Sequence, residues 1–137
     1  PISSLFKFRK AELEDDVTYG TKLYSPCKGY IKELRDGIDD QPIGIKDPSM
    51  GGGNYLVINC NGFDVMLAHI KKDTFLVKMD DQVEVGQELA QIGNSGNTEG
   101  PHLHLMAYRW TDDNTEKIPV PMAFDGKLMY RYDIVSY

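Results

Sequence analysis

"VINCNGFDVML", residues 57–67, is the stretch that decides the fold. It places Asn61-Gly62 between two runs of β-type residues, and Asn-Gly favours the positive φ angles of a tight hairpin turn. We therefore predict an antiparallel hairpin here. Similar runs, separated by Gly, Pro, Asn and Asp, predict strands over Lys22–Tyr24, Gly29–Leu34, Tyr55–Cys60, Phe63–Ile70, Gln82–Val85, Glu88–Ile92 and His102–Trp110.

These short strands with frequent turns predict an all-β fold, a compact antiparallel β-sandwich or barrel-like core with long loops. The 137 residues suit a single domain over 1–137. Residues 1–19 form an N-terminal segment with no firm period, and "DGIDDQPIGIKDPSMGGG", residues 36–53, reads as a long surface loop. The tail, residues 118–137, predicts a closing β-segment, and no helix longer than two turns is expected.

The composition argues against a nucleic-acid partner and against a transmembrane segment. The formal net charge of −6 argues against nucleic acid, whose binding requires clustered Lys and Arg. No apolar run approaches the roughly 18 residues of a transmembrane segment. Cys27 and Cys60 are either a disulfide or two small buried thiols, and we favour buried free thiols.

Two of the chain's three histidines lie one residue apart in "NSGNTEGPHLHLMAYRW", residues 94–110. If this segment is a strand, His102 and His104 project from the same face while Leu103 and Leu105 face the core. Two such imidazoles suit a metal ligand paired with a proton carrier, or two metal ligands. They would also arise as surface histidines that alternate with core leucines by chance. His69 ends a β-type run where the strand gives way to a loop, a position common in active sites.

Three segments, in order and spacing, resemble the M23 (lysostaphin and LytM-type) zinc metallopeptidases. They are "GTKLYSPCKGYIKEL", "GGGNYLVI" and "MLAHIKKDTFLVKMDDQVEVGQELAQIGNSGNTEGPHLHL". The family pattern runs approximately G-T-x-V-x-A-P-x-x-G, G-N-x-V-x-I, Y-x-H-L and G-P-H-L-H-[FL]-E. The match covers roughly residues 19–108.

The resemblance implies the all-β fold of the LytM type, with a duplicated hybrid motif, and hydrolysis of peptide bonds in peptidoglycan cross-links. It implies Zn²⁺ as cofactor, with His104 as a ligand and with His69 and His102 as catalytic histidines that orient water and stabilise the tetrahedral intermediate. The substrate groove would be walled by two loops, with site residues Gly53, Asn54, Asn94, Ser95 and Gly100. An extracytoplasmic location, in the cell envelope or secreted, also follows from the resemblance.

The sequence departs from the family pattern at the other two zinc ligands, an H-x-x-x-D motif before the G-T-x-V segment. No histidine precedes His69; Glu12 and Asp16 have the four-residue spacing, but with Glu in the histidine position. We expect the pair to lie upstream of Pro1, with residues 1–19 as an insertion, or else to be lost. Leu67 stands where Tyr is frequent, and Met106 where an acidic residue is frequent.

Two function hypotheses follow: a zinc endopeptidase, or a catalytically degenerate domain that binds or activates partners in the cell envelope. A third reading comes from "VKMDDQVEVGQELAQIG", which resembles biotinyl and lipoyl carrier domains. Those domains need a modified lysine in the hairpin that follows, and "NSGNTEGPHLH" stands there instead. The carrier reading is therefore disfavoured.

Overall fold

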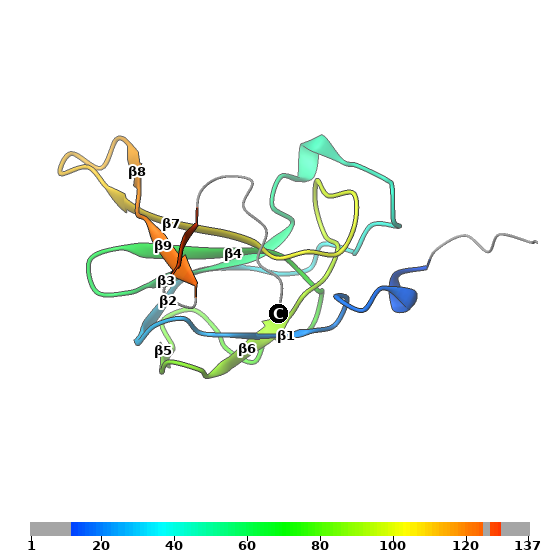
Figure 1. Ribbon diagram of the computed structural model, residues 1–137, viewed down its shortest axis with the longest axis horizontal. Helices are drawn as coiled ribbons and strands as arrows, with labels where there is room; N and C mark the ends of the chain where they lie inside the picture. The colour runs from blue at the N-terminus through cyan, green and yellow to red at the C-terminus, as the bar shows by residue number, and fades with distance from the viewer. Residues whose placement is uncertain (1–11, 125–126, 130–137) are drawn as a thin grey trace, which may run out of the picture.

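The computed structural model describes residues 12–124 and 127–129. Within these ranges the regular structure is β-strand, apart from the short 3-10 helices η2 (Leu13–Asp15) and η3 (Pro48–Met50) (Figure 1). None of the helices in this part of the chain has the length and apolar character needed to cross a membrane. The strands are β1 (Lys22–Tyr24), β2 (Gly29–Arg35), β3 (Asn54–Asn59), β4 (Asp64–Ile70), β5 (Gln82–Val83), β6 (Glu88–Gln91), β7 (His104–Trp110), β8 (Lys117–Pro119), β9 (Met122–Phe124) and β10 (Lys127–Met129).

The predicted all-β antiparallel fold is confirmed. Six strands form one antiparallel sheet in the order β5-β2-β3-β4-β7-β8, which is open and not closed into a barrel. β1 pairs with β6, and β9 pairs with β10. In Figure 1 the β1–β6 pair lies below β3, β4 and β7, and both sheets contribute to one core. This core includes Leu23, Leu89, Ala90, Ile31, Leu56 and Ile58.

The Asn-Gly hairpin is also confirmed, and it joins β3 to β4. Asn61 and Gly62 have φ angles of 57° and 104°, and the Cys60 N–H donates a hydrogen bond of 2.7 Å to the Phe63 carbonyl. Because both central residues adopt positive φ, the turn twists in the same sense as the strands it connects. The two most central strands of the sheet are thereby paired locally.

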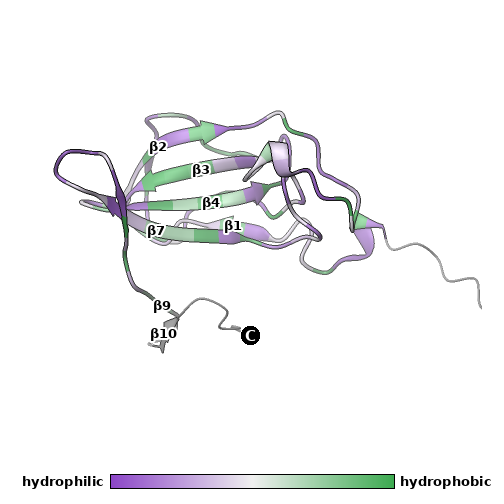
Figure 2. Ribbon diagram, turned by 90° about the horizontal axis from the view of Figure 1, so that it is seen from above, coloured by the Kyte–Doolittle hydropathy of each residue, from purple (hydrophilic) through white to green (hydrophobic). Residues whose placement is uncertain are grey.

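The register of β4 against β7 separates the two faces of the sheet. Val65 pairs with Ala107 and Leu67 with Leu105, and these four side chains point into the core. Figure 2 shows β2, β3, β4 and β7 side by side, with apolar residues along the strands and hydrophilic residues in the loops. Burial of the alternate residues fixes the register, since a one-residue slip would exchange the faces.

The predicted strand His102–Trp110 begins two residues too early, because β7 starts at His104. The chain bends over residues 99–101, and the ladder with β4 ends at the pair of Ala68 with His104, so residues 102 and 103 are not part of the strand. Leu103 and Leu105 pack against the core, as predicted. In the tail, β8, β9 and β10 agree with the predicted closing β-segment, whose residues 125–126 and 130–137 lie outside the described residues.

The preference for free cysteines was wrong, because Cys27 and Cys60 form a disulfide. Cys27 precedes β2 and Cys60 follows β3, and pairing of these two strands brings their Cα atoms to 5.8 Å, within the usual range for a bridge. The sequence separation of 33 residues gave no indication of this proximity. The bridge ties the β1–β2 connection to the central hairpin.

Replacing both cysteines, as Cys27→Ala/Cys60→Ala, should lower the free energy of unfolding by about 2–4 kcal/mol, because the unfolded chain is released from a long closed loop. Urea unfolding followed by circular dichroism measures the difference. The unreplaced protein under reducing conditions should fall to the level of the variant, and the variant should not respond to reductant. Equal stability of the two oxidised proteins would show that the bridge does not constrain the unfolded chain.

Candidate functional site

All three histidines gather at one end of the large sheet. Their ligand atoms lie within 4.8 Å of one another, and within the described residues this is the group of His, Cys, Asp and Glu side chains able to hold a metal ion. The His69 ring centroid lies 4.7 Å from that of His102 and 5.8 Å from that of His104. The structure therefore brings together the three residues that the sequence singled out for chemistry.

His69 reaches this cluster through a β-bulge in β4. Asn54 pairs with Ile70 and Tyr55 with Ala68, so His69 has no partner residue on β3. It adopts a φ of 62°, in the left-handed region that non-glycine residues rarely occupy. Regular alternation would place its side chain on the core face with Leu67, and the bulge turns it toward the histidine cluster. Such a strained position is typical of functional sites.

Hydrogen bonds fix the tautomer of the His69 ring. Its Nδ1–H donates to the Ser95 carbonyl at 2.7 Å, and because a carbonyl only accepts, Nε2 carries the lone pair in the neutral ring. The Ser95 hydroxyl in turn accepts from the Asn54 N–H at 3.0 Å and donates to the Ile70 carbonyl at 2.8 Å. Ser95 therefore links the histidine to β3 and to the end of β4.

His102 is held in the same way by the turn that carries it. Its Nδ1 donates to the Gly100 carbonyl at 2.9 Å and lies 3.1 Å from the Thr98 hydroxyl. Thr98 is itself fixed by hydrogen bonds to Gly100 and Asn94. The bond to the carbonyl leaves Nε2 of His102 available to accept a proton or a metal.

Desolvation by the surrounding protein lowers the pKa of both His69 and His104. For His69 the hydrogen bond to Ser95 opposes this effect, and the neighbouring histidines add to it; for His104 the charge of His102 adds to it. A lowered pKa keeps the imidazole neutral near neutral pH. A neutral imidazole is the form that a metal ligand or a general base requires.

Two of the histidines, His69 and His104, line a groove of ≈ 290 Å³. Its floor is the outer face of β4 and β7, and a glycine loop and the turn after β6 form its walls. The lining residues are Gly51, Gly52, Met66, Ala68, His69, Asn97, His104 and Met106. His69 and His104 therefore border the same groove, His69 as a buried residue and His104 as an exposed one.

The remaining predicted groove residues occupy supporting positions. Asn54, Asn94 and Ser95 are fully buried and bond to backbone behind the groove. Gly100 anchors the His102 ring. Gly53 packs so closely on Ser95 that a Cβ built on it would lie 2.4 Å from the Ser95 carbonyl. The structure places the predicted residues behind the groove, while the wall is made by their neighbours Gly51, Gly52 and Asn97.

Sequence reasoning missed Asp40, which fastens the 36–53 loop to the site. Its carboxylate accepts from the Asn94 N–H at 2.6 Å and from the Tyr19 hydroxyl at 3.0 Å, and its backbone forms a bridge with Ser95. Burial, followed by Asp40, raises the pKa of Tyr19 to about 12. One acidic residue in an irregular loop has no pattern by which the sequence could have indicated this role.

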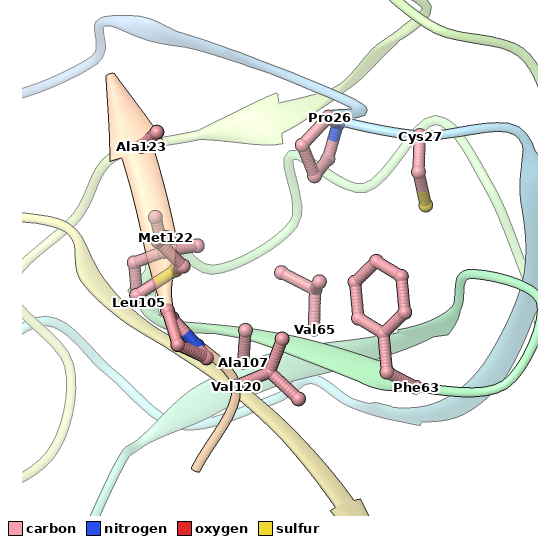
Figure 3. Close-up of a pocket in the computed structure, with 10 residues that line it drawn as sticks. Pro26, Cys27, Phe63, Val65, Leu105, Ala107, Val120, Met122 and Ala123 are labelled. Atoms are coloured by element: carbon pink, nitrogen blue, oxygen red, sulfur yellow. The ribbon is translucent and has the colours of Figure 1, made fainter. Parts of the chain in front are cut away.

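The acidic residues before Gly20 do not join the histidines. Glu12 and Asp15 cap η2 reciprocally, and the Asp16 carboxylate accepts from the Thr18 N–H. The suggestion that Glu12 and Asp16 substitute for the missing ligand pair is therefore not supported. A second pocket, of ≈ 250 Å³, lies on the core face beside the disulfide (Figure 3). Its walls are apolar, so it offers no group for acid–base chemistry.

Comparisons with known proteins agree on one family. The model described as "Peptidase family M23" matches residues 16–118. The peptidoglycan DD-endopeptidase ShyA of Vibrio cholerae is 38% identical over 72 residues, which are 52% of this chain and 16% of that protein. Lipoprotein NlpD of Yersinia enterocolitica is 36% identical over 58 residues, 42% of this chain and 58% of that protein. The chain thus spans less than two thirds of the length of these relatives.

Solved structures of peptidases have a fold similar to that of this chain. A zinc-containing peptidase from Vibrio cholerae superposes with a TM-score of 0.51 at 33% identity, covering 65% of this chain and 24% of that one. The catalytic domain of lysostaphin from Staphylococcus simulans superposes with a TM-score of 0.54 at 23% identity, covering 74% of this chain and 68% of that one. The second likeness shows the fold alone.

Gly53→Ala should destabilise the protein much more than Gly37→Ala. Both glycines have positive φ, but a Cβ at Gly53 would meet the Ser95 carbonyl, whereas Gly37 has open space around it. We expect a loss of about 1 kcal/mol for Gly37→Ala from backbone strain alone, and at least twice that for Gly53→Ala. Urea unfolding measures both. Equal losses would mean that the packing of Gly53 on Ser95 contributes nothing.

Stability should fall between pH 10 and about 12 because of two tyrosines, Tyr19 and Tyr108, each of whose pKa is raised to about 12 chiefly by burial. The Tyr19 phenol loses its proton near pH 10 in the unfolded chain and near 12 in the folded protein. The unfolded state therefore loses its proton first and is favoured as pH rises through this window. Tyr19→Phe should flatten this part of the pH profile, and Asp40→Asn should lower the Tyr19 pKa, as read from phenolate absorbance. A Tyr19 that titrates near pH 10 in both the parent and Asp40→Asn would contradict the contact.

Proposed function

The chain belongs to peptidase family M23, and from this premise we propose that it is a zinc-dependent endopeptidase that hydrolyses peptide bonds in peptidoglycan. The observation that carries the proposal is the histidine cluster. Three imidazoles, from the end of β4, the residues just before β7 and the start of β7, converge within 4.8 Å, and two of them have one ring nitrogen fixed by a backbone carbonyl. His69 and His104 line the open groove. An arrangement held this tightly suits catalysis, which requires positioned groups.

The histidines supply the type of donor atom that zinc prefers. Imidazole nitrogen is a preferred zinc ligand, and catalytic zinc sites keep one position open for water or substrate. We assign His104 as a ligand, as the family motif implies. Bound zinc would supply Lewis acidity, which polarises a carbonyl group and acidifies water. The other two ligands in the family motif have no counterpart in this chain, since no histidine precedes His69.

His69 and His102 are assigned to proton transfer. Each presents Nε2 as the free acceptor, and the lowered pKa of His69 keeps that ring neutral before reaction. Nε2 of one of these two rings takes a proton from the attacking water while the water oxygen bonds to the carbonyl carbon of the substrate. As the C–N bond breaks, the proton passes to the leaving amine. The protonated ring also stabilises the negative charge on the carbonyl oxygen.

Peptidoglycan is proposed as substrate from the relatives, one of which is named a peptidoglycan DD-endopeptidase. The cell envelope or the extracellular space is proposed as the location. The Cys27–Cys60 disulfide supports that location, because such bridges persist in oxidising compartments. The net charge of −6 does not suit a nucleic-acid substrate.

A second candidate function is a non-catalytic domain that binds or activates partners in the envelope. The specific observation behind it is that residues 1–19, which precede the G-T-K-L segment, contain no H-x-x-x-D pair. A fold retained without a complete ligand set keeps its groove as a binding surface. Metal content separates the two candidates.

His104→Ala should remove both zinc and activity, whereas His69→Ala and His102→Ala should keep zinc and lose about 10²–10⁴-fold in the rate of peptidoglycan hydrolysis. The reason is that a ligand holds the metal, while a proton carrier acts only in the reaction. The protein is prepared at its full native length. Zinc is measured by elemental analysis and activity by release of soluble peptidoglycan fragments.

Lys72→Gln is the control, because Lys72 lies outside the groove and pairs with Asp39. It should retain zinc and activity. If the unreplaced protein holds no zinc and releases no fragments but still sediments with peptidoglycan, the enzyme proposal is wrong and the protein is a binding module. If His69→Ala loses the metal as fully as His104→Ala, His69 is a ligand and its assigned role is wrong.

A further inference from the structure

The floor of the groove carries a pair of methionines beside the histidines. Met66 of β4 and Met106 of β7 are directly opposite one another in the antiparallel register, and the next pair on the same face is Ala68 with His104. Both methionines line the groove together with His69 and His104. The pair is thus one step along the strands from the ligand histidine.

These methionines belong to an apolar row that crosses three strands. Val57 of β3 pairs with Met66, and Met66 pairs with Met106. Val57 is buried, Met66 is half-buried and Met106 is 38% exposed. The row therefore becomes more exposed toward β7, on the side where His104 lies.

Space above the row is kept open by a glycine. A Cβ built on Gly52 would lie 3.5 Å from the Met66 methyl carbon and 3.3 Å from the Ala68 Cβ, so the wall touches the floor at that point. Any larger residue in the wall would project over the methionines. With glycine there, the thioether of Met66 stays accessible from the groove.

No charged side chain of the described residues lines this groove. A Lys or Glu side chain of a substrate would lose water on the methionine floor without gaining an ionic partner. An apolar side chain would instead exclude water from Met66 and Met106, whose flexible, polarisable chains adapt to different shapes. The chemistry of the floor thus discriminates between classes of side chain.

We propose that Met66 and Met106 form an apolar subsite that binds an uncharged, apolar side chain of the substrate next to the scissile bond. This rests on the proposed peptidase function for the bond cleavage, but the binding itself does not depend on catalysis. The two methionines are specificity-determining residues, and the substrate class is a peptide with an aliphatic residue beside the bond that is cut.

The test uses peptides of the form acetyl-Ala-Ala-X-Ala-Ala-amide, with X as Leu, Gly, Lys or Glu, and the protein at its full native length. Mass spectrometry identifies the bond cleaved, and kcat/KM is measured for each peptide. We expect the Leu peptide to exceed the Gly, Lys and Glu peptides at least 10-fold, since apolar contacts of this size give differences of that order. In Met66→Ala/Met106→Ala the preference for Leu should fall to less than about 3-fold.

Met79→Ala is the matched control, because Met79 is 49% exposed and lies outside the groove. It should keep the preference for Leu. Methyl NMR gives a readout independent of turnover: the Leu peptide should shift the Met66 and Met106 methyl signals and leave that of Met79 unmoved. The Lys peptide should shift neither groove methionine at the same concentration.

The outcomes separate the two proposals. Cleavage with no dependence on X overturns the subsite and leaves the peptidase assignment standing. Methyl shifts specific to the Leu peptide without cleavage of that peptide support the subsite, and the peptidase assignment is then decided by peptidoglycan release from the same preparation. Absence of both cleavage and methyl shifts overturns the subsite, as does a preference for Leu that survives in the double variant.

Discussion

The hydrogen bonds of Ser95 are the constraint on which the site depends. Its carbonyl accepts from the His69 ring, and its hydroxyl connects the Asn54 N–H with the Ile70 carbonyl. Ser95 is fully buried, so these bonds form where water cannot compete. A single small polar residue thereby sets the tautomer of the histidine and joins the turn after β6 to two strands. Loss of either contact would leave a buried polar group unpaired, which costs more than the bond contributes.

Close approach of two backbones makes this arrangement possible. Gly53 lies against Ser95, and a Cβ on Gly96 would lie 2.4 Å from the Gly53 backbone nitrogen. Only glycine allows the loop before β3 and the turn after β6 to touch at this distance. Asp40 adds a further contact, because its carboxylate accepts a hydrogen bond from the Asn94 N–H next to Ser95. The groove wall is therefore built by backbone packing and buried hydrogen bonds, and its apolar lining is supplied by the sheet.

The sequence predicted the parts of this structure that local patterns encode. The Asn61-Gly62 turn, the alternation along the strands and the approximate strand bounds are local, and all were found. The H-L-H motif and His69 were identified through their setting and family resemblance. The β-bulge at His69, the disulfide and the contacts of Asp40 were not predicted. Each depends on contacts between segments that are distant in sequence and come together only when the sheet forms. The spacing of residues in the sequence does not predict such contacts.

The pairing of β4 with β7 serves stability and function at once, because the two faces of these strands have different tasks. One face supplies Leu67, Leu105 and their neighbours to the core; the other presents His104 and the methionine pair to the groove. A slip of one residue would bury His104 and expose Leu105. Burial of the core residues therefore also determines that His104 lies on the groove face of the sheet. His69 is the exception, since alternation would send it inward. The bulge and its positive φ reverse that direction at one residue, and burial of Leu67 before it and Ile70 after it keeps the rest of the register unchanged.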